Sequence, residues 1–218
     1  MFNVVTITRE YGSGGSEIGR KVANLLGFEL LDRKLIEQVA VMGNIDFASA
    51  EQLDGKSGAW WEKLLSGFRH GGSALYLGDS PEIEIDNDTL QGLTARIITT
   101  AGNAGNCVIV GRSSQCVLRQ VRRALHVLVY APLPEKLDRM KQRHPHERDL
   151  VGLLHQIDTE RTHYANTYYG CDSSNRQFYH VCLNSTIGLD TCAELIASAI
   201  QPAKQSRAGV LPVLAQNR

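Results

Sequence analysis

The sequence predicts an α/β fold in which a parallel β-sheet lies between two layers of helices. Short apolar runs of strand length alternate with segments of helical periodicity, the order that builds parallel sheets covered by helices. The first apolar run ends in a glycine-rich turn that leads directly into a helical segment. Hydrophobic residues make up 43% of the 218 residues, which suits one domain with a single buried core.

The N-terminal half contains two expected strands and an irregular stretch. A helix through Ile18 and Leu26 follows the first strand, and the second strand ends at Asp32. From residue 43 to about 88 the periodicity breaks down, and long irregular stretches in compact domains usually carry function. We therefore expect one domain over residues 1–200, with a small helical lobe inserted at 43–100. The expected elements are strands at 4–8 and 28–31 and helices at 34–42 and 89–100.

The C-terminal half continues the alternation of strands and helices. Its clearest buried strand is Cys107 to Val110, which stops at Gly111 and Arg112. The segment from residue 201 to 218 has two prolines and mixed polar residues, and we expect a flexible tail there. The expected elements are strands at 107–110, 125–130 and 179–183 and helices at 134–143, 150–169 and 189–200.

Composition narrows the classes of partner. Lys plus Arg and Asp plus Glu both number 23, so no overall field favours a nucleic-acid polymer or an anionic membrane. No apolar run approaches the roughly 20 residues of a membrane span, and we expect a cytoplasmic protein. The five cysteines lack C-x-x-C spacing and are expected to be reduced thiols. The sequence allows a homodimer without specifying one.

The glycine-rich turn has the backbone pattern of a phosphate-binding loop. Against the P-loop pattern G-x-x-x-x-G-K-[ST], Arg9 takes the first glycine, Gly14 the second, Gly15 the lysine and Ser16 the hydroxyl residue. Glycines let successive N–H groups face one anion, and the helix dipole adds partial positive charge. The alternative is a tight turn without a ligand. The candidate phosphate-binding residues are Arg9, Gly12, Ser13, Gly14, Gly15, Ser16 and Glu17, with Ser16 also a candidate Mg²⁺ ligand.

The missing lysine calls for another positive charge near the loop. Arg9 lies at the loop entrance, and Arg20 lies one helical turn after Ser16. Arg112 follows a buried strand at its carboxyl end, where ligands bind in open α/β sheets. Solvation, or pairing with Glu10 or Glu17, is the alternative for Arg9 and Arg20.

Five stretches together carry a family resemblance. They follow one another in order along the chain at residues 7–15, 31–36, 108–112, 125–132 and 179–185. With them the chain resembles the P-loop nucleoside monophosphate kinases, specifically the bacterial cytidylate kinase-like family. The resemblance implies a P-loop NTPase three-layer sandwich that uses ATP and Mg²⁺ and moves the γ-phosphate onto CMP or dCMP. It makes residues 1–200 one P-loop kinase-like domain, whose small helical lobe inserted at 43–100 binds the acceptor or acts as a lid.

The resemblance also implies roles for individual residues. Arg112 matches an arginine that contacts the nucleotide phosphate, whereas Asp158 and Arg161 match a pair that binds the cytidine sugar and the phosphates. Asp32 and Arg33 stand where the family begins its monophosphate-binding segment. Arg112, Arg161 and Arg20 are therefore the candidate catalytic residues, and Asp32, Arg33 and Asp158 the candidate substrate-binding residues. A helix cap at Asp32 and a surface pair between Asp158 and Arg161 are the alternatives.

The chain departs from true cytidylate kinases at several positions. Gly15 replaces the lysine, Ser113 replaces an acid, and the strand at 108–110 has no carboxylate. These departures leave two alternatives open: a degenerate nucleotide-binding sensor or scaffold, and a kinase for another small acceptor. A lysine restored at position 15 is expected to leave ATP binding intact or better.

Overall fold

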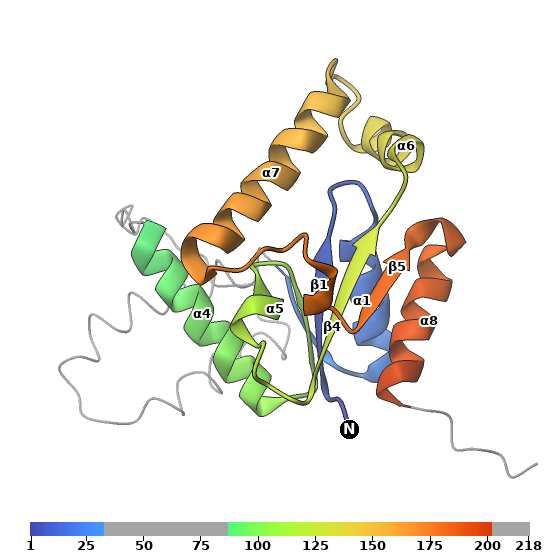
Figure 1. The fold of residues 1–218 in the computed structure, drawn as a ribbon. Coiled ribbons are helices and arrows are strands. Elements are labelled where there is room, and N and C mark those ends of the chain that lie inside the picture. The colour runs from blue at the N-terminus through green and yellow to red at the C-terminus, as the bar shows by residue number, and fades with distance from the viewer. Residues whose placement is uncertain (33–86, 202–218) are drawn as a thin grey trace, which may run out of the picture.

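The computed structural model describes residues 1–32 and 87–201 of the chain. Five parallel strands form one sheet in the order β2-β3-β1-β4-β5, with helices on both faces (Figure 1). This is the three-layer P-loop α/β architecture that the sequence predicts. The strands are β1 (Val4–Arg9), β2 (Glu29–Leu31), β3 (Cys107–Val110), β4 (Ala124–Tyr130) and β5 (Val181–Asn184).

The helices follow the predicted order, with one addition. Their bounds are α1 (Gly15–Leu26), α4 (Asn87–Ala104), α5 (Ser114–Val117), α6 (Leu133–Arg143), α7 (Leu150–Tyr169) and α8 (Leu189–Ile200). The bounds of β3, α7 and α8 are those predicted, whereas α5 was not predicted. Two 3₁₀ turns, η1 (Arg176–Phe178) and η2 (Ser185–Ile187), flank β5. The predicted helix at 34–42, the irregular part of the predicted lobe and nearly all of the predicted tail lie outside the described residues.

Strand β1 occupies the centre of the sheet. It pairs with β3 on one side and β4 on the other, so that Val4 is in register with both Cys107 and Ala124. Parallel strands need long crossover connections, which the helices supply. The loop that follows β1 therefore emerges at the middle of the carboxyl edge of the sheet.

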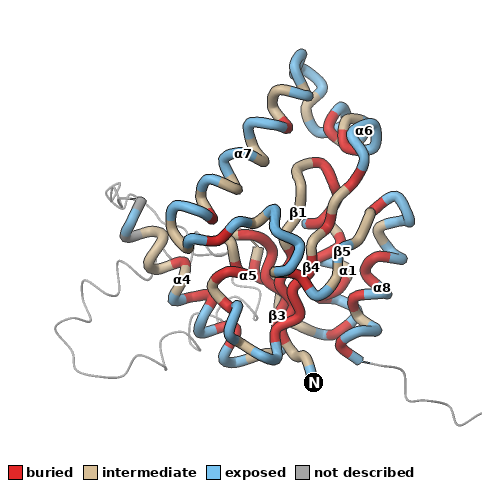
Figure 2. Tube along the Cα trace, in the orientation of Figure 1, coloured by how far each residue is buried: buried red, intermediate tan, exposed pale blue. Residues whose placement is uncertain are grey.

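Both faces of the sheet are buried, which explains why the strands read as continuous apolar runs. On one face Val5 and Ile7 pack with residues of α1 and α8. On the other face Val4 packs with Ile98 of α4 and with its neighbours. Burial is concentrated in the central strands and in the inner faces of the helices (Figure 2). The described part of the predicted lobe, α4, is thus packed on the sheet.

Helix α1 lies close to the sheet because Gly19 faces it. A Cβ built on Gly19 would lie 2.6 Å from Val110 Cγ2 and 3.4 Å from Ile7 Cδ1. Real Cβ atoms do not approach a neighbour at the shorter distance, so only glycine fits this contact. Gly19 thereby lets α1 approach β3 and β1 closely near their carboxyl ends.

A disulfide corrects the expectation that all cysteines are reduced. Cys116 of α5 and Cys171, directly after the α7 cap Gly170, are bonded, with a Cα–Cα distance of 6.1 Å. The two cysteines are 55 residues apart in the sequence, so no short Cys-to-Cys spacing could have predicted this disulfide. Cys107, Cys182 and Cys192 are free thiols. The bond ties the segment after β3 to the end of α7.

Two histidines form a polar contact within the otherwise apolar sheet. The side chains of His126 and Thr6 are in hydrogen-bond contact, with Nδ1 and Oγ1 2.7 Å apart. The backbone N–H of His126 donates to His180 Nδ1 at 2.9 Å. Burial, assisted by the neighbouring His180, lowers the pKa of His126 from 6.5 to about 4. His126 is therefore neutral near neutral pH.

No helix within residues 1–32 and 87–201 combines the length and the apolar character that crossing a bilayer requires.

The close contact at Gly19 predicts that alanine destabilises the fold at this position but not at an open helical position. Gly19→Ala should lower the free energy of unfolding by about 1–3 kcal/mol, because the added methyl group overpacks the contact between helix and sheet. Gly92→Ala is the matched control on α4, since a Cβ there meets no described atom within 4 Å. That control should gain about 0.5–1 kcal/mol of helix propensity. Urea unfolding of both variants measures the difference, and equal effects would contradict the packing assignment.

The pKa of His126 predicts that stability falls with acidification. The folded pKa lies below the unfolded value, so the unfolded state binds more protons as pH falls from about 6.5 toward 4. The free energy of unfolding should drop by about 1–2 kcal/mol between pH 7 and pH 5 from this group alone. His126→Asn, which does not titrate, should lose that part of the pH dependence. An unchanged slope in this variant would show that other groups carry it.

Candidate active site

Three of the predicted site residues follow neighbouring strands at one edge of the sheet. Arg9 ends β1, Asp32 follows β2, and Arg112 comes two residues after β3. Because all the strands are parallel, these residues share the carboxyl edge. The glycine-rich loop between β1 and α1 lies at the centre of this edge. The topology therefore brings together residues that are up to about a hundred positions apart in the sequence.

The loop alternates between left-handed and ordinary backbone conformations. Gly12 and Gly14 have φ values of +78° and +82°, whereas Tyr11 and Ser13 have negative φ. The turn is closed by Ser13, whose N–H and hydroxyl both donate to the Glu10 carbonyl, at 3.3 and 2.8 Å. Alternation of this kind turns successive N–H groups into one concavity that binds anions. The glycines are thus required by the backbone.

Several N–H groups of the loop have no acceptor among the described residues. The N–H groups of Glu17 and Ile18 already bond to the Gly14 carbonyl, at 3.0 Å each. Those of Gly12, Gly14, Gly15 and Ser16 donate to no described atom. They lie at the N-terminus of α1, where the helix dipole adds partial positive charge. Unsatisfied N–H groups at a helix N-terminus are the arrangement that anion sites use in proteins.

Helix α7 contacts the loop through the predicted pair Asp158 and Arg161. Asp158 Oδ1 accepts a hydrogen bond from the Tyr11 N–H at 2.8 Å. Arg161 Nη1 donates to the Arg9 carbonyl at 3.0 Å and to Asp158 Oδ1 at 3.1 Å. Burial raises the pKa of Asp158, while the Tyr11 N–H, Arg161 and Lys136 partly oppose this shift. The pair is therefore joined to the loop rather than confined to the helix surface.

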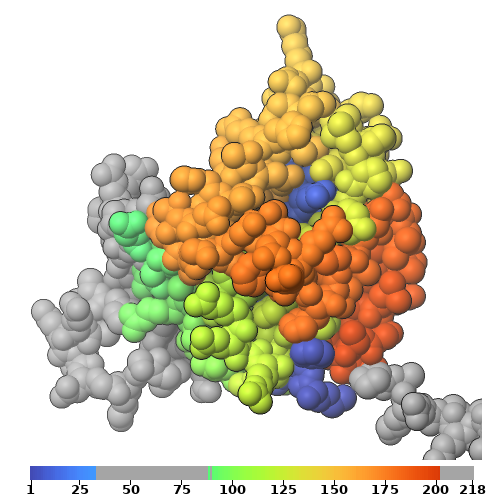
Figure 3. Space-filling model, viewed as in Figure 1, coloured from blue at the N-terminus to red at the C-terminus, as the bar shows by residue number. Residues whose placement is uncertain are grey.

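Helix α6 contacts the loop from the other side. The Lys136 ammonium lies 2.8 Å from Glu10 Oε2, and its side chain is 11% exposed. Arg139 Nη1 donates to the Gly12 carbonyl at 3.3 Å and to Ser185 Oγ, after β5, at 3.0 Å. Atoms of the N-terminal segment are visible at the surface between α6 and α7 (Figure 3). The loop is thus enclosed by two helices and remains open between them.

Arg9 fills the space that two glycines leave. A Cβ built on Gly15 would lie 2.5 Å from Arg9 Cβ and 3.0 Å from Arg9 Cγ. A Cβ built on Gly111, which has φ +82°, would collide with the Arg9 guanidinium. Position 15 therefore cannot hold a lysine while Arg9 keeps this conformation. A Gly15→Lys variant would therefore have to displace Arg9, and its expected ATP binding stays a prediction.

Strained backbone surrounds Arg112. Gly111, Arg112 and Ser113 have φ values of +82°, +55° and +51°, and the two non-glycine residues are unfavourable in this region. A hydrogen bond holds this segment in place, since the Gly111 N–H donates to the Ile7 carbonyl at 3.0 Å. The Arg112 guanidinium carbon lies 5.9 Å from the centre of the Tyr164 ring of α7. Strain of this kind persists where surrounding structure imposes it, commonly at functional sites.

The remaining predicted residues lie farther from these contacts. Ser16 and Arg20 are exposed on α1, and no described contact joins Arg20 to the loop. Glu17 pairs with Lys21 at 4.0 Å, and Arg33 lies outside the described residues. No group of three or more metal-ligating side chains occurs in the described segments.

The sequence did not single out Lys136, Arg139 or Tyr11. One signal for Lys136 was present, because it is spaced i,i+4 from Met140 and the two are the buried residues of α6. A lysine on the buried face of a helix is uncommon unless it is paired. Tyr11 Oη lies 2.8 Å from His144 Nε2, a tertiary contact that no spacing reports.

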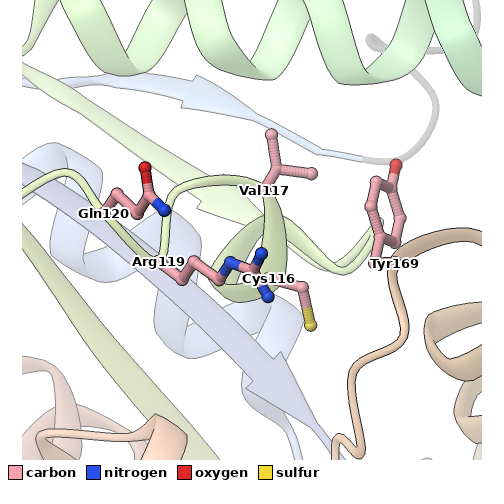
Figure 4. A pocket seen from close by; sticks show the side chains of 5 residues that line it. All are labelled: Cys116, Val117, Arg119, Gln120 and Tyr169. Atoms are coloured by element: carbon pink, nitrogen blue, oxygen red, sulfur yellow. The ribbon is translucent and has the colours of Figure 1, made fainter.

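A pocket beside α5 is separate from the loop. Its cavity volume is about 340 Å³, and its wall includes the disulfide residue Cys116 and Tyr169 at the end of α7 (Figure 4). Its other lining residues are Val117, Arg119 and Gln120. None of the predicted site residues lines it, so the pocket gives no support to a role in phosphate binding.

The Gly15 contact yields a test of the loop. Gly15→Ala should lower the free energy of unfolding by about 1–3 kcal/mol, since the new methyl group meets Arg9 Cβ. Adding Arg9→Gly in the same chain should recover most of the loss. Ser16→Ala, at the exposed neighbouring position, should change stability by less than about 0.5 kcal/mol. Thermal unfolding of the four proteins decides, and a Gly15→Ala variant as stable as the wild type would refute the contact.

Comparison with solved structures agrees with the fold. A crystal structure of an uncharacterized protein from Eubacterium ventriosum superimposes with a TM-score of 0.66 at 16% identity, covering 93% of this chain and 99% of that chain. Shikimate kinase from Acinetobacter baumannii in complex with shikimate gives a TM-score of 0.49 at 15% identity, covering 94% and 96%. Shikimate kinase from Bacteroides thetaiotaomicron gives 0.47 at 12% identity, covering 91% and 98%.

The sequence comparisons identify the family. No curated protein matches the chain. The model of the cytidylate kinase-like family matches residues 4–187, which include β1, the loop, every later strand and both helices that enclose the loop. The matched residues include those at the carboxyl edge of the sheet. The chain therefore belongs to the cytidylate kinase-like family.

Proposed function

We propose that the protein is an ATP-dependent kinase that transfers the γ-phosphate to a nucleoside monophosphate, with CMP or dCMP as the first candidate. The observation that carries the proposal is the loop between β1 and α1, whose N–H groups at Gly12, Gly14, Gly15 and Ser16 have no acceptor among the described residues. A phosphate chain supplies such acceptors. Family membership supports the reaction class.

The loop suits the donor nucleotide. Its N–H groups would hold the phosphates, and the exposed Ser16 hydroxyl would be one ligand of Mg²⁺, which keeps most of its coordination for water and phosphate oxygens. Bound Mg²⁺ would neutralise part of the phosphate charge. The protein's own contribution is to fix the phosphates in the loop between α6 and α7.

Three arginines at this edge of the sheet would stabilise the charge that develops during transfer. Arg9 lies between the loop and Gly111, Arg112 follows β3, and Arg161 donates to the Arg9 carbonyl. Phosphoryl transfer depends mainly on positioning and electrostatic stabilisation, which guanidinium groups provide. Arg20 remains a candidate for the same role from its exposed position on α1.

The acceptor would lie between α7 and the end of β2. Asp158 is held by Arg161 and by the Tyr11 N–H, so its carboxylate faces the loop. A carboxylate in this place can accept hydrogen bonds from sugar hydroxyls. Asp32 follows β2 at the same edge of the sheet. The identity of the acceptor depends in addition on residues outside the described segments, including Arg33.

A nucleotide sensor without turnover is the second candidate. It is favoured by the contact between Arg9 and Gly15, which excludes the lysine that P-loop kinases use. A sensor would bind ATP at the same loop and release no ADP. A kinase for another small acceptor would release ADP only with that acceptor.

The test is ADP release by the purified protein across a panel of nucleoside monophosphates and other small hydroxyl acceptors, with ATP binding measured in parallel. The kinase proposal expects turnover that is highest with CMP or dCMP. ATP binding without ADP release from any acceptor would favour the sensor. ADP release that occurs only with another kind of acceptor would support a kinase but would reject nucleoside monophosphates as its substrates.

Arg112→Ala tests the same site at one residue. It should weaken ATP or acceptor affinity about 10- to 100-fold, corresponding to about 1.5–3 kcal/mol for a hydrogen bond to a charged group. Arg122→Ala is the matched control, because Arg122 is exposed and precedes β4 at the opposite edge of the sheet. Equal affinities for both variants would remove Arg112 from the site.

A further inference from the structure

A buried lysine beside the phosphate loop has no role in the functions considered above. Lys136 of α6 is 9% exposed as a residue, and its ammonium is 2.8 Å from Glu10 Oε2. Lysine is rarely buried to this extent unless it is paired. The partner, Glu10, is the first residue of the loop after β1 and is 39% exposed at its side chain. The ion pair therefore lies at the rim of the loop.

The stem of Lys136 begins in contact with the loop. A Cβ built on Gly12 would lie 3.0 Å from Lys136 Cβ and 3.1 Å from its carbonyl oxygen. From there the side chain reaches Glu10, so it runs along the loop from Gly12 to its first residue. Its charge also lowers the pKa of Asp158, which itself bonds to the Tyr11 N–H. Lys136 thus contacts the Glu10–Gly12 segment at both ends, through its Cβ at Gly12 and its ammonium at the Glu10 carboxylate.

Position 15, which holds the lysine in the P-loop pattern, has no room for one. Position 15 is closed to a larger side chain by Arg9 Cβ, 2.5 Å from where its own Cβ would stand. A phosphate chain still needs a compact cation beside it, and an ammonium on a flexible stem supplies that as a point charge. A lysine that reaches the loop from α6 leaves the space beside Gly15 to the side chain of Arg9.

We propose that Lys136 binds the nucleotide phosphates in place of the missing loop lysine, and that Glu10 holds its ammonium when no nucleotide is present. The inference rests on the proposed nucleotide-binding function and adds to it a residue on a different helix. Of the three donors of the ammonium, one is used by Glu10, and no other described atom accepts from it. Glu10 in turn has a second contact, with the Ala131 N–H at 3.5 Å, that remains when the ammonium turns to a phosphate.

The experiment measures the affinity of the full-length protein for ATP and for inorganic pyrophosphate by calorimetry. Lys136→Met should weaken both affinities about 10- to 100-fold, and Lys136→Arg should restore them to within about fivefold. Lys141→Met is the matched control, being the same substitution on the same helix at an exposed side chain paired with Asp138. It should leave both affinities unchanged.

Glu10→Gln separates phosphate binding from a purely structural ion pair. The proposal expects tighter binding of pyrophosphate in Glu10→Gln, because the ammonium is released to the anion, and no such gain in the double variant with Lys136→Met. A structural pair predicts lower stability in both single variants without that dependence. The double-mutant cycle therefore decides even if Lys136→Met unfolds more easily.

The outcomes distinguish this inference from the proposed function. If the wild type binds neither ATP nor pyrophosphate, the proposed function fails and the inference fails with it. If the wild type binds ATP and Lys136→Met binds it equally well, the role of Lys136 is refuted while the proposed function stands. A gain from Glu10→Gln that persists without Lys136 would also refute it.

Discussion

The arrangement of the site depends on two hydrogen bonds from α7 to the backbone of the glycine-rich loop. Asp158 accepts from the Tyr11 N–H, and Arg161 donates to the Arg9 carbonyl. Only Leu154 and Ala165 of the 20 residues of α7 are buried (Figure 2). Apolar packing alone therefore contributes little to fixing this helix against the rest of the domain. These polar contacts fix where the helix lies and hence where its side chains face. The loop and α7 therefore form one unit, although about 150 residues separate them.

Opposite charges flank the loop in two pairs. Glu10 with Lys136 occupies one side, and Asp158 with Arg161 occupies the other. Each pair neutralises itself in the absence of a ligand, which keeps buried charge from being left without a partner. The two pairs thus place two carboxylates and two cations beside the loop whose N–H groups at Gly12 and Gly14 to Ser16 have no described acceptor.

The regular elements of the fold could be read from the sequence because burial on both faces makes each strand a continuous apolar run. Cys107 to Val110 is such a run, and its predicted bounds are those of β3. Predicted site residues such as Arg9, Arg112, Asp158 and Arg161 gather around the loop because chain order and parallel pairing place strand ends together. Contacts between distant side chains left no local pattern. The disulfide of Cys116 and the placement of Lys136 belong to this class, since each depends on how helices pack.

The contact between Arg9 and Gly15 has a consequence for how this loop can change during evolution. The residue at position 9 and the residue at position 15 compete for one volume, and Gly111 opens the space for the rest of the Arg9 side chain. An arginine at the first position and a lysine at the second exclude each other in this backbone. Homologous loops should therefore contain one of two combinations, arginine with glycine or glycine with lysine. A sequence pattern that demands the lysine would overlook every loop of the first kind, although both kinds join a strand to a helix through the same glycine-rich turn.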